Sequence, residues 1–169
     1  FGTDALRMAM IVGIGPGNDI SLSEDKVKTY KHFANKIWNA SRFVLENTED
    51  YDRSKQPEKL RPLDKKDLDK FNKLTKEITK EMEEYKFYLA GEKLYHYFWH
   101  TFADDLIEES KEDLKGHEQW AQESAIWTLN YILRNSLKML HPFMPFITEE
   151  IWKEFDDKLL MIKSWPNGK

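Results

Sequence analysis

Apolar residues recur at helical spacing along most of this 169-residue chain, and that spacing limits its fold class more than any other feature. The clearest example is residues 24–47, where the mostly apolar positions fall on one stripe at about 100° per residue. The positions on this stripe are Val27, Tyr30, Ala34, Ile37, Trp38, Ser41, Val44 and Leu45. The pattern predicts a long helix that packs the stripe against a core.

Helix-starting and helix-ending residues divide the rest of the chain into further helical segments. Ser21 or Ser23 is expected to cap the helix at 24–47. Gly91 is expected to separate two helices, and Pro142 to end another. We expect the helices to cover residues 4–12, 24–47, about 68–88, 92–110, 118–140 and 145–155.

The segments between these helices are polar and are expected to be exposed. Residues 48–62 form the longest connector, and residues 111–117 form a charged loop. Only residues 160–164 alternate in the manner of a short strand. The segment 118–140 has apolar residues on several sides, which predicts a helix at the centre of a bundle. The predicted fold is therefore an all-α, antiparallel helix bundle.

Composition excludes several classes of protein. The chain is 40% hydrophobic and 33% charged, which suits one folded domain with one core. No apolar run is long enough to span a bilayer, and the first residues lack the charge pattern of a signal peptide. We expect no contact with a membrane and a cytoplasmic location, with which the absence of cysteine is consistent.

The side of the 24–47 helix opposite the apolar stripe is basic, amide-bearing and aromatic. From residue 26 to residue 45 there are four lysines, one arginine and no carboxylate, although the net charge of the chain is -4. An acidic chain does not bind nucleic acid through bulk charge, so any such binding must be local. The candidate binding residues on this side are Lys28, His32, Asn35, Lys36, Asn39 and Phe43, with Arg42 at its edge.

These side-chain types suit a polynucleotide. Lysine and arginine neutralise phosphates, asparagine can hydrogen-bond a base edge, and an outward phenylalanine offers a plane for an unstacked base. The alternative from the residues alone is a solvated helix face, with Phe43 folded into the groove of an adjacent helix.

Two other patterns imitate functional sites. Residues 10–17 look like a strand followed by a glycine-rich nucleotide loop, but residues 19–23 separate the glycines from the next helix, which favours a plain turn. Glu92, His96, His100 and Asp104 form a ladder at helical spacing but lack the HExxH glutamate, which favours an ordinary polar face and no metal. Trp99 lies off the apolar side of its helix and is kept as an additional candidate base contact.

Four stretches of the chain carry a resemblance to a known family. Residues 32–46, and the run Phe33–Asn39 within them above all, resemble the start of the anticodon-binding helical domain of valyl-tRNA synthetases, which are class I aminoacyl-tRNA synthetases. Residues 1–7 are similar to the segment after the KMSKS-type loop of these enzymes, and residues 15–20 to the turn into the first helix of the domain. Residues 140–152 resemble the corner and helix that close the domain.

The resemblance implies a division of labour along the chain. Residues 1–23 would link the bundle to a missing catalytic part and contact the tRNA stem, residues 24–155 would form the anticodon-binding bundle, and residues 156–169 would be an exit segment. The helix with Lys36, Asn39, Arg42 and Phe43 would read the anticodon arm, with tRNA-Val as the expected partner of a monomeric domain.

The resemblance also implies where the chemistry takes place. The HIGH-type and KMSKS-type motifs of the catalytic domain are absent, so this fragment is expected to have no catalytic residue and no cofactor of its own. ATP and magnesium are expected only in the missing catalytic part. Two alternatives stay open: the equivalent domain of an isoleucyl- or leucyl-tRNA synthetase, which shares the corner at residues 142–150, and a non-enzymatic helical module that binds a protein.

Overall fold

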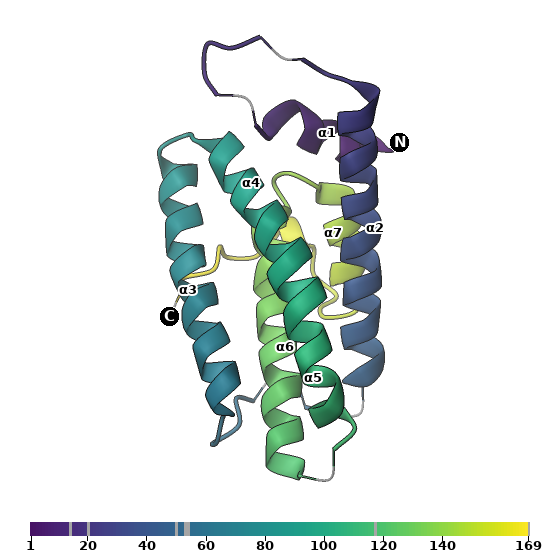
Figure 1. The fold of residues 1–169 in the computed structure, drawn as a ribbon, viewed down its shortest axis with the longest axis vertical. Helices are drawn as coiled ribbons and strands as arrows, with labels where there is room; N and C mark the ends of the chain where they lie inside the picture. Colours follow the sequence, from purple (N-terminus) through teal and green to yellow (C-terminus); the bar gives the residue numbers. More distant parts are fainter. Residues whose placement is uncertain (14, 20, 50, 53–54, 117, 169) are drawn as a thin grey trace.

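The computed structural model describes every residue except 14, 20, 50, 53–54, 117 and 169, and it shows a bundle of helices (Figure 1). Helices α2 and α3 form opposite edges of the bundle with α4, α5 and α6 between them, and α1 lies across one end. The described residues contain no strand, so the predicted all-α bundle is confirmed. The elements are α1 (Thr3–Ile11), α2 (Glu24–Asn47), α3 (Pro62–Glu83), α4 (Phe87–His96), the π-helical η1 (Tyr97–Leu106), α5 (Ile107–Leu114), α6 (Gln119–Leu140), α7 (Pro145–Trp152) and the 3-10 turn η2 (Leu160–Ile162).

Helix α2 begins and ends where the sequence predicts. Ser23 is its N-cap, and the side-chain oxygen of Ser23 accepts a hydrogen bond from the backbone N–H of Lys26 at 3.2 Å. Glu24 and Asp25 stand in the first turn, where the helix dipole favours negative charge. At the other end the side chain of Asn47 donates to the carbonyl of Phe43 at 2.8 Å.

The buried side of α2 is rotated by roughly 40° about the helix axis from the predicted stripe. Phe33 and Ala40 belong to the core, whereas Trp38 is 45% exposed, so the prediction that Trp38 is a core residue was wrong. The two residues differ in exposure because different elements face the two sides of α2. Rings of α4 and η1 cover Phe33, whose centroid is 4.8 Å from that of Tyr95 and 6.1 Å from that of Phe98, while Trp38 lines a groove between α2 and the short α7.

The turn between α3 and α4 differs most from the prediction. α3 ends at Glu83, and Tyr85 adopts a left-handed backbone conformation with φ 60°. The backbone N–H of Lys86 donates to Glu81 and that of Tyr85 to Met82, at 2.8 and 3.2 Å, which is the hydrogen-bond pattern of a Schellman cap. Because Tyr85 stands where this cap usually has glycine, the sequence gives little sign of the helix end.

Gly91 lies inside α4 and does not separate two helices as predicted. A Cβ at Gly91 would be 2.7 Å from the side chain of Val12 and 3.2 Å from the ring of Phe143. The glycine therefore allows α4 to approach α1 and the corner before α7. From Phe87 the helical chain continues without a break through η1 to Leu114, so most of the predicted loop at 111–117 is helical. His117 of that loop, like Ile14 of the glycine-rich turn, lies outside the described residues.

The predicted exposed connector at 48–62 contains a buried arginine. The Arg61 side chain is only 8% exposed, and its guanidinium donates to both oxygens of Asp64 at 2.6 and 2.7 Å and to Asp113. Its backbone N–H donates to Ser124 at 2.8 Å. Arg61 thus joins the start of α3 to α5 and α6, a role that its position in a polar stretch did not indicate.

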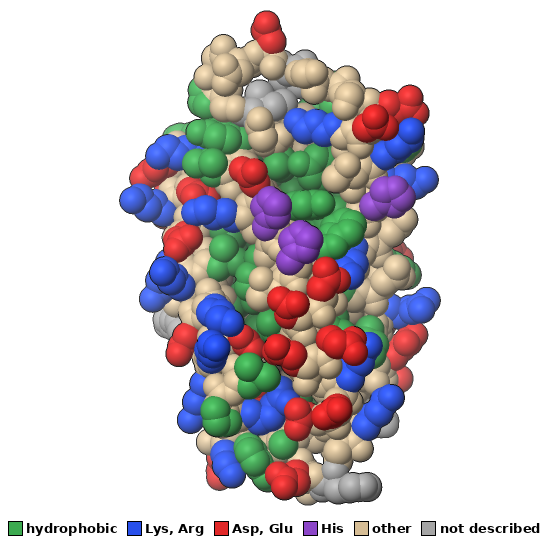
Figure 2. Space-filling view, viewed as in Figure 1, with side chains coloured by type: hydrophobic (Ala, Val, Ile, Leu, Met, Phe, Trp, Pro, Cys, Tyr) green, Lys and Arg blue, Asp and Glu red, His purple; other side chains and the backbone are tan. Residues whose placement is uncertain are grey.

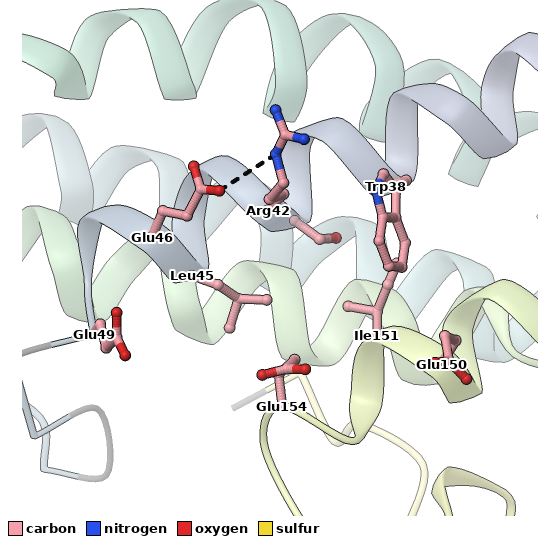
Figure 3. Close-up of a pocket in the computed structure, with 9 residues that line it drawn as sticks. Trp38, Arg42, Leu45, Glu46, Glu49, Glu150, Ile151 and Glu154 are labelled. Carbon is pink, nitrogen blue, oxygen red and sulfur yellow. Dashed lines mark ion pairs between the residues drawn. The ribbon is translucent and has the colours of Figure 1, made fainter.

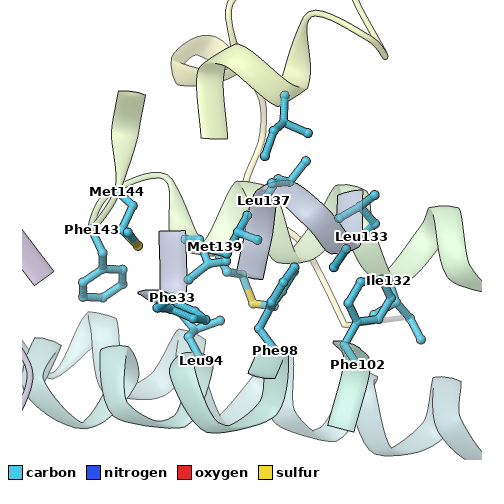
Figure 4. Packing of buried hydrophobic residues seen from close by; sticks show 14 of the residues in the cluster. Phe33, Leu94, Phe98, Phe102, Ile132, Leu133, Leu137, Met139, Phe143 and Met144 are labelled. Carbon is cyan, nitrogen blue, oxygen red and sulfur yellow. The ribbon is translucent and has the colours of Figure 1, made fainter. Parts of the chain in front are cut away.

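Helix α6 passes through the centre of the core, as its sequence predicts. Its buried residues point to several sides, toward α2, α3, α4 and α7. Figure 4 shows this packing around Phe33, Leu94, Phe98, Phe102, Ile132, Leu133, Leu137 and Met139. The candidate face on α2 therefore stands on a rigid, well-packed support.

The first and last segments both pack on the bundle. The Asp4 carboxylate accepts hydrogen bonds from the backbone N–H groups of Phe146 and Ile147 at 3.2 and 2.7 Å, which caps the start of α7. The Trp165 indole donates to Thr79 of α3 at 2.8 Å. Residues 160–162 form a 3-10 turn where the sequence suggested a strand, and no helix among the described residues has the length and apolar character needed to cross a membrane.

Candidate nucleic-acid interface

The outward side of α2 runs along one edge of the bundle (Figure 1). We call its exposed candidate residues the outer face of α2; they are Lys28, His32, Asn35, Asn39 and Arg42. The spacing of Asn35 and Asn39 by four residues makes their amides neighbours on the helix surface. The other two candidates, Lys36 and Phe43, are half-buried on the flank that faces η1 and α5.

Lys36 is held by two groups of η1. Its ammonium lies 2.5 Å from a carboxylate oxygen of Asp104 and 5.8 Å from the centroid of the Trp99 ring. Trp99, the additional candidate base contact, is half-buried and stacks on Phe33 with ring centroids 6.2 Å apart. Lys36 is therefore fixed in direction, and the Trp99 ring is engaged with protein on at least one side.

Phe43 does not project freely from the helix. Its ring is partly buried against the core, and the ammonium of Lys111 lies 5.9 Å from its centroid. Phe43 therefore packs in part toward an adjacent helix, as the alternative interpretation of the sequence predicts. Only the remaining exposed part of the ring is accessible to a base.

Carboxylates at the two ends of α2 itself partly neutralise the cations of the outer face. Lys28 lies 3.8 and 3.7 Å from Glu24 and Asp25, and the Arg42 guanidinium lies 3.4 Å from Glu46. Figure 2 shows acidic and basic side chains interspersed along the α2 edge. Exposed ion pairs of this kind contribute about 0–1 kcal/mol, so a phosphate can displace them at little cost.

The two patterns that imitate other sites have plain structural explanations. His96 and His100 stack with centroids 5.9 Å apart, and His100 lies 3.6 Å from Asp104. Within the described part of the chain, no group of three or more histidines and carboxylates is placed to hold a metal ion. Residues 10 and 11 of the nucleotide-loop pattern belong to helix α1 and not to a strand. The described residues between Ile11 and α2 form turns and irregular backbone, so no helix begins directly after the glycines.

Comparison with known proteins places the chain in a family. Residues 64–169 match the model of the anticodon-binding domain of tRNA ligase. The chain belongs to this family. Similar proteins include the valine--tRNA ligases of Clostridium acetobutylicum, 41% identical over 98% of this chain, Thermotoga maritima, 40% identical over 98%, and Aquifex aeolicus, 41% identical over 90%. The chain spans 14–19% of the length of these relatives.

The outer face of α2 comes before residues 64–169, which match the family model of this anticodon-binding domain. It lies inside the region that is similar to the valine--tRNA ligases, because that region covers nearly the whole chain. The sequence does not indicate that Asp104 and Lys111 lie beside the candidate residues Lys36 and Phe43. Asp104 belongs to η1 and Lys111 to α5, both far along the chain, so the local pattern of α2 contains no sign of them.

Proposed function

We propose that this domain binds the anticodon arm of tRNA-Val through the outer face of α2, as part of a valine--tRNA ligase. The observation that carries the proposal is an exposed row of amides and cations on α2, in a chain similar along nearly its whole length to proteins with that name. The similarity to valine--tRNA ligases favours valine over the isoleucyl and leucyl alternatives.

Each side chain of the interface has a distinct expected role. The Asn39 amide, central and exposed, would hydrogen-bond a base edge, with Asn35 and His32 beside it. Lys28 and Arg42 would exchange their exposed carboxylate partners for phosphates. On the flank, Lys36 would donate from the direction that Asp104 fixes, and the exposed part of the Phe43 ring would stack on a base.

The wider assignments follow the same proposal. Aminoacylation with ATP and magnesium would take place in a part of the longer protein outside this chain, which spans 14–19% of the length of its relatives. Residues 1–23 would link to that part and contact the tRNA stem, and residues 156–169 would lead out of the bundle. We propose that the domain is monomeric and acts in the cytoplasm.

The salt dependence of tRNA binding tests the proposal. Phosphate contacts release counterions, so the affinity for a tRNA-Val transcript should fall steeply with salt concentration. Lys28→Ala should weaken binding to any anticodon equally and make the log–log salt slope shallower by about one unit. Lys66→Ala is the matched control, because it removes an exposed lysine from α3 at the opposite edge of the bundle.

Three results would contradict the proposal. If Lys28→Ala and Lys66→Ala have equal effects, the outer face of α2 is not the binding surface. If binding is insensitive to salt, or absent, the chain is better described as a module that binds a protein.

A further inference from the structure

A groove separates α2 from α7 on the side of α2 next to the outer face (Figure 3). Its volume is about 440 Å³, within the range of about 300–1,000 Å³ that is typical of small-molecule sites. An apolar strip runs along it, formed by Trp38 and Leu45 of α2 and Ile151 of α7. Trp38 is 45% exposed, which is unusual for a side chain of this size and leaves part of the indole unpartnered by protein.

Carboxylates dominate the charge of the groove. Four glutamates line it against a single cation, Arg42, which pairs with Glu46 at 3.4 Å. Glu150 is paired with Lys153, outside the groove, at 2.5 Å. Glu49 and Glu154 have no ion-pair partner among the residues that the structure describes. The groove therefore has an excess of negative charge.

The helix ends add to that field. Glu49 lies two residues beyond the end of α2, and Glu154 lies two residues beyond the end of α7. The C-terminal end of a helix carries partial negative charge on its last carbonyl groups, and it favours cations. Both unpaired carboxylates thus stand where the backbone also attracts a positive ligand.

A buried hydroxyl at the groove wall gives an independent sign of a ligand. Ser41 lines the groove and is 1% exposed, yet its oxygen has no hydrogen-bond partner among the described residues. A buried polar atom without a partner costs free energy, and such atoms are uncommon in folded proteins. An N–H donor in the groove would satisfy it.

We propose that the groove between α2 and α7 binds a linear aliphatic polyamine. Its ammonium groups would pair with Glu49 and Glu154 and donate to Ser41, while its methylene chain would lie on the apolar strip and one ammonium would face the Trp38 indole. A cationic protein segment fits less well, because Lys153 lies just outside the groove and would repel a cation that extends beyond it. The proposal is independent of tRNA binding, since a polyanion is repelled by this groove.

Calorimetric titration of the tRNA-free chain with spermidine tests the proposal. Glu49→Gln/Glu154→Gln should weaken spermidine binding about tenfold, because two charge pairs near the surface are lost. Trp38→Leu should weaken it about threefold through loss of the ring face. The matched control Glu109→Gln/Glu112→Gln removes two exposed carboxylates from α5 and should change the affinity less than about twofold.

A second cation separates a built site from diffuse attraction to an acidic protein. Hexaamminecobalt(III) has the same charge as spermidine but no aliphatic chain, so it should bind wild type more weakly, and Trp38→Leu should reduce this difference. The proposal is overturned if the two cations bind equally, if the α5 variant loses as much affinity as the groove variant, or if spermidine does not bind.

Discussion

Phe33 and Trp38 are aromatic residues of α2 that differ in exposure, and Phe33 makes more buried contacts with the core than Trp38 does. Phe33 is fully buried among rings of α4 and η1, whereas Trp38 is 45% exposed beside the groove. The cost of truncating a side chain depends on the buried contacts that it loses.

We therefore expect Phe33→Ala to lower the free energy of unfolding by about 3–5 kcal/mol. Trp38→Ala should lower it by about 1–2 kcal/mol, because nearly half of its surface is already in water. Urea midpoints of both variants check the pair. Equal losses would show that Trp38 lies in the core after all, as its helical spacing predicts.

His141 is a half-buried residue in the corner before α7. One ring nitrogen lies 2.9 Å from the Thr148 hydroxyl, which itself donates to the carbonyl of Met144. Burial lowers the pKa of His141 below its ordinary value of 6.5, against the opposing effects of Glu149 and Asp4. The folded protein therefore binds a proton at this site less readily than the unfolded chain does.

The sign of the pH dependence follows from linkage. The contribution of His141 to stability is complete above its unfolded pKa and is lost as the pH falls below that value, because the unfolded chain then takes up the proton. Between about pH 8 and about pH 5, wild type should lose more stability than His141→Gln. Urea midpoints at each pH measure this, and a variant that loses as much stability as wild type would contradict it.

At the scale of elements, Arg61 joins three helices through a buried ionic cluster. Removal of one partner from such a cluster leaves the remaining charges uncompensated, which costs about 3–5 kcal/mol. We expect a loss of this size for Arg61→Ala. The matched control is Lys153→Ala, whose pair with Glu150 is short but exposed, so its loss should change the free energy of unfolding far less than the loss of Arg61. Denaturation midpoints that fall equally would mean that the Arg61 cluster contributes no more than a surface pair.

Elements that depend only on their own sequence could be predicted, whereas elements that depend on contacts with distant parts of the chain could not. α2 and α6 follow from helical spacing and, for α2, the Ser23 cap, because a stripe over six turns leaves little ambiguity. The α3–α4 turn could not be predicted, because Tyr85 occupies a position that favours glycine, and the real glycine, Gly91, serves a close approach to α1. That approach involves Val12, about 80 residues earlier in the chain.

The candidate interface divides in the same way. The five exposed residues on the outer face could be found from α2 alone, since a helix fixes which side chains share a side. The ion pair of Lys36 with Asp104 and the contact of Phe43 with Lys111 could not, because each depends on how α2 packs against a helix from another part of the chain.

At the scale of the whole molecule, α2 separates two surfaces of different chemistry. Its outer face bears amides and cations on a chain of net charge -4, and the adjacent groove bears an excess of carboxylates. Arg42 belongs to both surfaces and lies at their border. A polyanion is attracted to the cations of the outer face and repelled by the carboxylates of the groove, so the two surfaces together favour its approach on the outer side of α2.

The most direct test of the central claim is anticodon discrimination at Asn39. Two tRNA-Val transcripts that differ only in the anticodon are titrated with wild type, Asn39→Ala and the control Asn167→Ala, which removes an exposed amide from the last segment. We expect wild type and the control to prefer the valine anticodon, and Asn39→Ala to lose about 1–3 kcal/mol of that preference. If Asn39→Ala keeps the full preference, the outer face of α2 does not read the anticodon.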